Sequence, residues 1–177
     1  TGDWMGRDAR RGFPYTWLPN HLGDAMGKVT PRSFLASLRE AAEESETKAS
    51  DYALHFEAIK TGVQRASRIR VQEMREDYPW MDQVFRPLAR LAVPTSFAEI
   101  EARWKESGLP EGLDSAPGKE DRPIPVPARF ERGLSGLRQD LEELGLFQSL
   151  TDGRINIPDV YRVGFGMLRR GGVKPVR

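Results

Sequence analysis

Apolar residues recur at helical spacing along most of the chain, and strand-like alternation appears only in one short stretch near the C-terminus. The first clear amphipathic helix is predicted from Thr30 to about Ser45. Thr30 suits its cap, and Pro31 suits its first position because the amide that proline lacks would have no partner there. The helical spacing assigns the following apolar residues to its buried side: Phe34, Leu35, Leu38, Ala41 and Ala42.

A second, longer helix is predicted over residues 52–77, with Ser50 or Asp51 as its cap and Pro79 as its stop. Its apolar positions repeat about every 3.6 residues. Gly62 interrupts this pattern at a cost of about 1 kcal/mol relative to alanine. We expect the polar side of this helix to be a solvated surface, and it carries Arg65, Arg68, Gln72 and Arg75.

Two shorter helices follow, and no strand is expected before the last third of the chain. One is predicted over 79–91, and the other is capped by Thr95 or Ser96, of which Ser96 has the spacing of a capping box with Glu99. Ahead of all these helices, residues 1–28 form an arm rich in glycine, proline and aromatic residues. Within this arm a short helix is expected around Asn20–Met26.

The C-terminal part of the chain has a different pattern. Residues 109–127 are dominated by proline, glycine and charged residues, as is typical of a linker. A helix is predicted over 130–144, and two short alternating segments around Asp152-Gly153 predict a β-hairpin. A helix followed by such a hairpin is the second half of a winged helix. The expected fold is therefore mainly α, in three parts: a helical bundle (1–108), a linker (109–127) and a small winged-helix-like α+β domain with a basic tail (128–177).

The composition excludes several classes of metal and catalytic site. The chain has a net charge of +1, no cysteine and two histidines. Disulfides, thiolate metal sites and cysteine nucleophiles are excluded, and the histidines lack the spacing of zinc ligands. No apolar run approaches the roughly 18 residues of a membrane span, so no membrane partner is expected. Because no secretory pattern begins the chain, the expected location is the cytoplasm.

The stretch GKVTPRSFLASLREAAEE resembles the first helix of the helical lid in AAA+-like and STAND-like bacterial P-loop ATPases. The segment EMREDYPW resembles the corresponding second lid helix, and in several such families a winged helix follows the lid. The resemblance covers most of the chain in order. It implies that Arg32 is a sensor-type arginine that reaches the γ-phosphate, a ligand well matched to the bidentate guanidinium. The alternative is an ion pair within the chain, with Glu40, Glu43 or an acid of the second helix.

The same resemblance limits what this chain does alone. It contains no G-x-x-x-x-G-K-[ST] motif and no apolar strand that ends in acidic residues for magnesium. We therefore expect no catalytic residue, no metal site and no cofactor bound by the chain alone. ATP and Mg²⁺ would be bound only by a P-loop core upstream. That ATPase core, or another protein subunit, is the expected partner.

A second interface is expected at the C-terminus, where the last sixteen residues hold five cations and no acid. A basic wing or tail on a winged helix is a common way to grip the DNA backbone. The expected contacts to double-stranded DNA are Arg154, Arg162, Arg169, Arg170, Lys174 and Arg177. However, Asp140, Glu142 and Glu143 make the helix before the hairpin acidic. Docking of a protein and a merely solubilising tail therefore stay open as alternatives.

The leading hypothesis is a non-catalytic regulatory region of a P-loop ATPase, which couples the nucleotide state to a DNA or protein partner through a winged helix. One alternative is a stand-alone winged-helix DNA-binding regulator whose N-terminal helices dimerise. Another is a purely structural protein-interaction module. A P-loop coding region upstream of Thr1 would favour the first hypothesis, and a start codon near Thr1 would favour the second.

Overall fold

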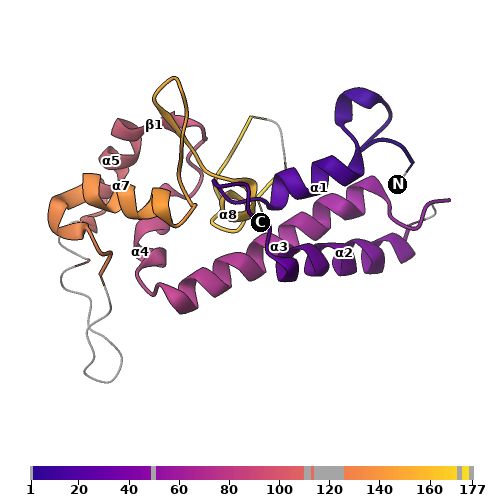
Figure 1. Cartoon of the computed structure of the whole chain (residues 1–177), viewed down its shortest axis with the longest axis horizontal. Coiled ribbons are helices and arrows are strands. Elements are labelled where there is room, and N and C mark those ends of the chain that lie inside the picture. The colour runs from indigo at the N-terminus through magenta and orange to yellow at the C-terminus, as the bar shows by residue number, and fades with distance from the viewer. Residues whose placement is uncertain (1, 49–50, 110–112, 114–125, 171–172, 176–177) are drawn as a thin grey trace.

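A computed structural model describes residues 2–48, 51–109, 113, 126–170 and 173–175. These residues are mainly helical with a small antiparallel sheet (Figure 1), as the sequence predicts. The α-helices are α1 (Pro14–Leu22), α2 (Pro31–Glu46), α3 (Phe56–Asp77), α4 (Met81–Phe85), α5 (Phe97–Glu106), α7 (Gly133–Glu143) and α8 (Asp159–Arg162). The strands are β1 (Thr95–Ser96), β2 (Gln148–Ser149) and β3 (Arg154–Asn156). The short 3-10 helices are η1 (Ala9–Arg11), η2 (Arg86–Leu88) and η4 (Phe130–Arg132). Within the described part, no helix has the length and apolarity needed to cross a bilayer.

Helices α2 and α3 lie side by side and antiparallel along one edge of the molecule (Figure 1). The predicted cap of α2 is confirmed, because the Ser33 amide donates to the Thr30 hydroxyl at 3.2 Å. The predicted buried side is partly wrong, since Leu35 is 65% exposed. The buried side of α2 instead carries small residues spaced four apart: Ser33, Ser37, Ala41 and Ser45.

Close approach of the two helix backbones explains both the small residues and Gly62. A Cβ atom at Gly62 would lie 2.2 Å from the Ser37 carbonyl oxygen, well inside contact distance. The glycine that breaks the apolar pattern of α3 is therefore required by packing against α2.

The start of α3 differs from the prediction. This helix begins at Phe56, four residues later than expected, because the His55 ring accepts a hydrogen bond from the Glu57 amide at 3.3 Å and caps it. Ser50, one of the two expected caps, lies outside the described residues. The predicted end is confirmed at Asp77.

The helix of the N-terminal arm also starts at a different place. Helix α1 begins at Pro14, ahead of the expected Asn20–Met26, because proline at the first helical position favours initiation. Leu18 and Leu22 of this helix are buried together with Met5 in a small core against α2 and α3. The arm therefore packs mainly on its own chain.

The sheet combines the predicted hairpin with an unpredicted strand. The hairpin around Asp152-Gly153 is confirmed as β2 paired with β3. Strand β1 adds to the other side of β3 with Thr95 opposite Ile155, which gives the strand order β1-β3-β2. A strand of two residues is too short to show alternation. The sequence indicated only a helix cap at Ser96. Ser96 does cap α5, because its hydroxyl accepts from the Glu99 amide at 3.2 Å.

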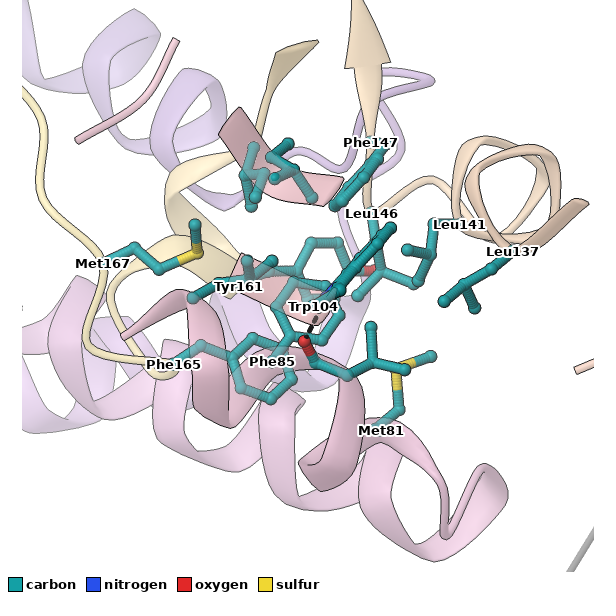
Figure 2. Close-up of a cluster of buried hydrophobic side chains, with 14 of the residues drawn as sticks. Met81, Phe85, Trp104, Leu137, Leu141, Leu146, Phe147, Tyr161, Phe165 and Met167 are labelled. Atoms are coloured by element: carbon teal, nitrogen blue, oxygen red, sulfur yellow. Dashed lines mark hydrogen bonds between the residues drawn. The ribbon is translucent and has the colours of Figure 1, made fainter. Parts of the chain in front are cut away.

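The larger hydrophobic core joins residues from both sides of the expected linker (Figure 2). The Trp104 indole of α5 donates to the Val84 carbonyl of α4 at 2.8 Å. The Phe85 ring of α4 stacks on Phe165, with ring centroids 4.0 Å apart. The Phe147 ring, just before β2, lies parallel to Trp104.

This shared core corrects the predicted domain organisation. The described residues of 128–177 pack on α3, α4 and α5 and share a sheet with β1, so they are not a separately packed domain. Most of the expected linker, 109–127, lies outside the described residues. The composition of 109–127 differs from that of its neighbours, but the larger core contains residues from both sides of this segment.

Candidate functional site

Arg32 occupies the second position of α2 and is mostly exposed. Its guanidinium Nη1 lies 2.9 Å from Oε1 of Glu73 in α3, and the Arg32 side chain is 73% exposed. This contact is the ion pair with an acid of the second helix that the sequence left open. Because most of the guanidinium faces solvent, the ion pair leaves donors of Arg32 free to meet a ligand.

A hollow of about 430 Å³ lies beside Arg32 on the polar side of α3. We call it the arginine hollow, and its charged and amide lining comprises Arg32, Arg65, Arg68, Gln72, Glu73, Arg75 and Glu76. The sequence placed the α3 residues on one solvated face. It did not place Arg32 beside them, because only the antiparallel packing brings the start of α2 next to the second half of α3.

The arginines of this hollow differ in how firmly they are held. Arg75 lies 2.7 Å from Asp82, and Arg65 lies 3.8 Å from Glu40. Arg68 is exposed and has no carboxylate within ion-pair distance among the described residues. The hollow therefore offers an unpaired cation and a weakly held one beside Arg32, which suits an anionic ligand.

Behind Arg32, a chain of polar contacts leads into the protein. The second oxygen of Glu73 accepts from Arg70 at 3.2 Å, and Arg70 also donates to the Tyr161 hydroxyl at 3.4 Å. Tyr161 belongs to α8 and is fully buried in the larger core. Burial raises the pKa of Tyr161 above its ordinary value, although Arg70 opposes the shift, so the phenol stays protonated.

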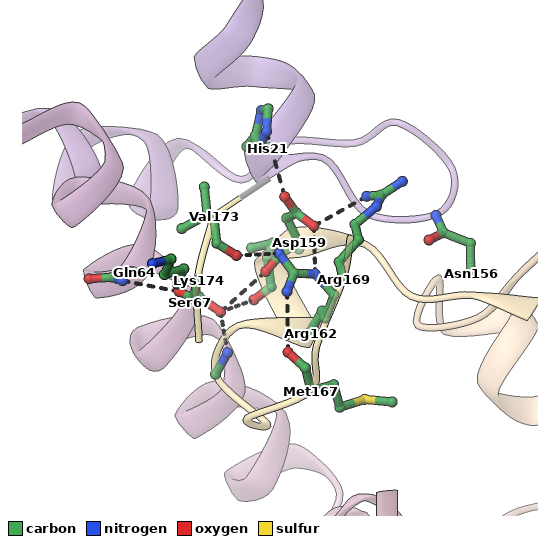
Figure 3. Close-up of polar contacts among 12 residues, drawn as sticks. His21, Gln64, Ser67, Asn156, Asp159, Arg162, Met167, Arg169, Val173 and Lys174 are labelled. Atoms are coloured by element: carbon green, nitrogen blue, oxygen red, sulfur yellow. Dashed lines mark hydrogen bonds and ion pairs between the residues drawn. The ribbon is translucent and has the colours of Figure 1, made fainter. Parts of the chain in front are cut away.

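A second polar cluster surrounds the buried carboxylate of Asp159 (Figure 3). Arg162 is fully buried, and its Nε donates to Asp159 at 2.8 Å. Its other nitrogens donate to the carbonyls of Met167 at 3.2 Å and Val173 at 2.6 Å. Arg162 was expected to contact nucleic acid; this is corrected, because its guanidinium is inaccessible and instead holds the C-terminal segment in place.

Arg169 and His21 also approach the same carboxylate. Arg169 Nη1 lies 3.3 Å from Asp159, so this predicted DNA contact is already engaged within the chain. His21 Nε2 lies 3.6 Å from Asp159, and His21 Nδ1 donates to the Trp17 carbonyl at 2.8 Å. Desolvation by burial lowers the pKa of His21, against the opposing effects of the Trp17 hydrogen bond and Asp159.

The outer surface of α7 and the hairpin carries paired charges. Arg138 donates to Glu142 at 2.9 Å. Arg154, the predicted wing contact, lies 2.7 Å from Asp152 of the hairpin turn. Arg132, just before α7, is exposed and has no carboxylate partner within the described ranges. Local ion pairing thus leaves this surface close to neutral.

The remaining predicted contacts lie at the end of the chain. Arg170 and Lys174 are exposed, and the Lys174 carbonyl accepts from Gln64 of α3 at 3.0 Å. Arg177 lies outside the described residues. The six residues predicted to bind nucleic acid therefore do not gather on one free surface among the described parts.

In the described part of the chain, no group of three or more histidine, cysteine, aspartate or glutamate residues could hold a metal ion. Comparisons of the chain with protein-family models, with curated proteins and with solved structures gave no match.

Proposed function

We propose that this chain is a non-catalytic regulatory and interaction region of a P-loop ATPase. In this proposal α2 and α3 form a lid-like part that senses the nucleotide through Arg32. The part from α4 to β3 acts as a winged helix that docks a partner. The nucleotide, with its Mg²⁺, is held by a P-loop core that this chain does not contain.

The exposed ion pair of Arg32 carries the proposal. A guanidinium at the rim of a cationic hollow, with one carboxylate contact at 2.9 Å, can exchange that contact for a phosphate oxygen. Removal of Arg32 from Glu73 would leave Glu73 with Arg70, its second partner. A two-state response of this kind is what nucleotide sensing requires, because a ligand shifts an equilibrium only through contacts that differ between states.

The order of elements supports the winged-helix part. Helix α4, strand β1, helix α5, helix α7 and the β2–β3 hairpin follow one another, and β1 pairs with β3. A winged helix combines helices with such a three-stranded antiparallel sheet, whose hairpin is the wing. On this interpretation the winged helix begins well before residue 128, with α4 and α5 as part of it.

Charge pairing on this part favours a protein partner over double-stranded DNA. Arg138 is engaged by Glu142, and Arg154 is engaged by Asp152. A helix and wing that bind DNA need free cations, since phosphate contacts supply most of the affinity. Except for Arg132, the arginines of α7 and the hairpin are already paired with acids, so docking of a protein is the better match.

The sensor role is tested in the assembled ATPase, with this chain joined to or combined with its P-loop core. Arg32→Ala should lower ATP turnover or nucleotide affinity by about tenfold or more. The matched control is Arg39→Ala, because Arg39 lies on the same exposed side of α2 and pairs only with Glu43 among the described residues. Equal turnover and affinity in the Arg32 variant and the wild type would reject the sensor role.

The choice of partner is tested by titration with duplex DNA at two salt concentrations. We expect no duplex binding of the kind that higher salt weakens and that the Arg138→Gln/Arg154→Gln double substitution also weakens. Salt-dependent binding that these substitutions abolish would favour the stand-alone DNA-binding regulator instead. If neither nucleotide nor DNA shifts the melting temperature of the assembled protein, the purely structural interaction module is the remaining hypothesis.

A further inference from the structure

The N-terminal arm carries a surface that the proposed function does not use. It comprises exposed side chains from Arg7, just before η1, to the first turn of α1, and we call it the arm surface: Arg7, Arg10, Arg11, Phe13 and Tyr15. In Figure 1 this segment lies near the N-terminus, at the end of the molecule away from α5 and α7.

The backbone under the arm surface is well fixed. The Asp8 carboxylate caps η1 by accepting from the Arg10 amide at 3.0 Å. The Met5 amide donates to the Gly12 carbonyl at 2.8 Å, and the Met5 side chain is buried. Gly12 has a φ of +84°, a left-handed conformation that favours glycine and turns the chain into α1. These contacts therefore hold the arm surface in a defined shape.

The three arginines of the arm surface are free cations. Arg7, Arg10 and Arg11 are all exposed, and in the described ranges no carboxylate lies within ion-pair distance of their guanidinium groups. The nearby Asp8 is engaged as the cap of η1. This differs from α7 and the hairpin, where arginines are paired with adjacent acids.

The two aromatic rings of the arm surface are presented to solvent. Phe13 and Tyr15 stack on each other, with centroids 5.5 Å apart and an angle of 27° between their planes. Phe13 is 41% exposed and Tyr15 is 73% exposed, whereas the apolar residues that anchor α1 are its buried leucines. The rings therefore add little to the core of this chain, and Tyr15 offers an open face.

We propose that the arm surface binds single-stranded nucleic acid. Free guanidinium groups contact successive phosphates, and an exposed ring stacks on a base, which is how proteins bind single strands without reading their sequence. A duplex keeps its bases stacked internally, so Tyr15 could not reach them. An acidic peptide would use the arginines but would gain nothing specific from a stacked pair of rings.

The test uses the whole chain and a fluorescent oligo-dT of about 12 nucleotides. Binding is followed by fluorescence anisotropy at about 50 and about 200 mM salt. Affinity should fall with salt with a log–log slope of about −2, as about 0.7 is expected for each of three phosphate contacts. Unlabelled duplex DNA and poly-glutamate should compete poorly.

Substitutions separate the charged and the stacking contributions. Arg10→Gln/Arg11→Gln, which keeps the aliphatic stem of Arg11 against Gly6, should weaken binding at least about tenfold and reduce the salt slope. Tyr15→Ser should weaken binding about tenfold, whereas Tyr15→Trp should retain it. The charge-matched control is Arg86→Ala/Lys105→Ala, because both residues are exposed and lie in η2 and α5.

Three results would overturn the proposal. The wild type could fail to bind the oligonucleotide at the lower salt, or the charge-matched control could lose as much affinity as the arm variants. Poly-glutamate could also compete equally well while Tyr15→Ser binds normally, which would assign the surface to an acidic protein. None of these results bears on Arg32, so this proposal and the nucleotide-sensing proposal stand or fall separately.

Discussion

Arg32 at the start of α2 pairs with Glu73 in the second half of α3, and their charged atoms lie 2.9 Å apart. Glu73 also accepts from Arg70, which reaches the buried hydroxyl of Tyr161 in α8. Three successive contacts therefore connect the exposed Arg32 of α2 with Tyr161 in the larger core. A ligand that removes Arg32 from Glu73 leaves Glu73 with Arg70 alone, the residue that touches this core.

Loss of Arg32 should hardly affect stability. Exposed ion pairs contribute about 0–1 kcal/mol, and Arg32→Ala leaves Glu73 with Arg70 as a partner. We expect the free energy of unfolding in urea to fall by less than about 1 kcal/mol. A larger loss would show that Arg32 serves mainly to hold α2 on α3, and a defect in nucleotide sensing could then arise from misfolding.

The buried pair of Arg162 and Asp159 should behave in the opposite way. Arg162 is fully buried and bonds to Asp159 and two carbonyls, so Arg162→Met leaves a buried carboxylate and two acceptors short of donors. Breaking such a pair typically costs about 3–5 kcal/mol. Urea unfolding should show a loss of this size, even though Arg169 and His21 stay near Asp159.

Arg170→Met is the matched control, because Arg170 is exposed and stands in the same basic segment. It should change the free energy of unfolding by no more than about 0.5 kcal/mol. Similar losses in both variants would contradict the structural role assigned to Arg162.

The two arginines show what a sequence can and cannot tell. The capped start of α2 was predictable from Thr30 and Pro31, since caps depend on neighbouring residues. The partner of Arg32 was not, because it depends on how α2 packs on α3. Counting cations identified a basic C-terminal segment, but burial of Arg162 depends on a carboxylate and two carbonyls that the fold brings together.

The fold shows the same limit. The hairpin was predictable from its Asp-Gly turn and alternating isoleucines. Strand β1 was not, because two residues carry no period and their pairing with β3 spans about a third of the chain. The core shared by the residues on both sides of 109–127 was also not predictable. The composition of a connecting segment does not indicate whether the parts on either side of it pack together.

Gly62→Ala separates packing from helix propensity. Propensity alone predicts that alanine stabilises α3 by about 1 kcal/mol. The structure predicts the reverse, because the new Cβ would lie 2.2 Å from the Ser37 carbonyl and push α2 away. We expect a loss of about 1–3 kcal/mol in the free energy of unfolding, as overpacking commonly causes. Gln72→Ala, at an exposed position of α3, is the control and should be nearly neutral.

The depressed pKa of His21 predicts that stability falls at mildly acidic pH. Burial lowers this pKa below the ordinary value of 6.5, so the unfolded chain takes up a proton that the native state resists. The stabilisation is complete above about pH 6.5 and is lost as pH falls from there towards the native pKa. For one proton the slope cannot exceed about 1.4 kcal/mol per pH unit.

The measurement is urea unfolding at about pH 7.5 and about pH 5.5, in the wild type and in His21→Gln. The glutamine amide can still donate to the Trp17 carbonyl but does not titrate. The wild type should lose more stability than the variant between the two pH values. If acidification instead stabilised the wild type relative to the variant, the ion pair between protonated His21 and Asp159 would outweigh the desolvation that lowers the pKa of His21.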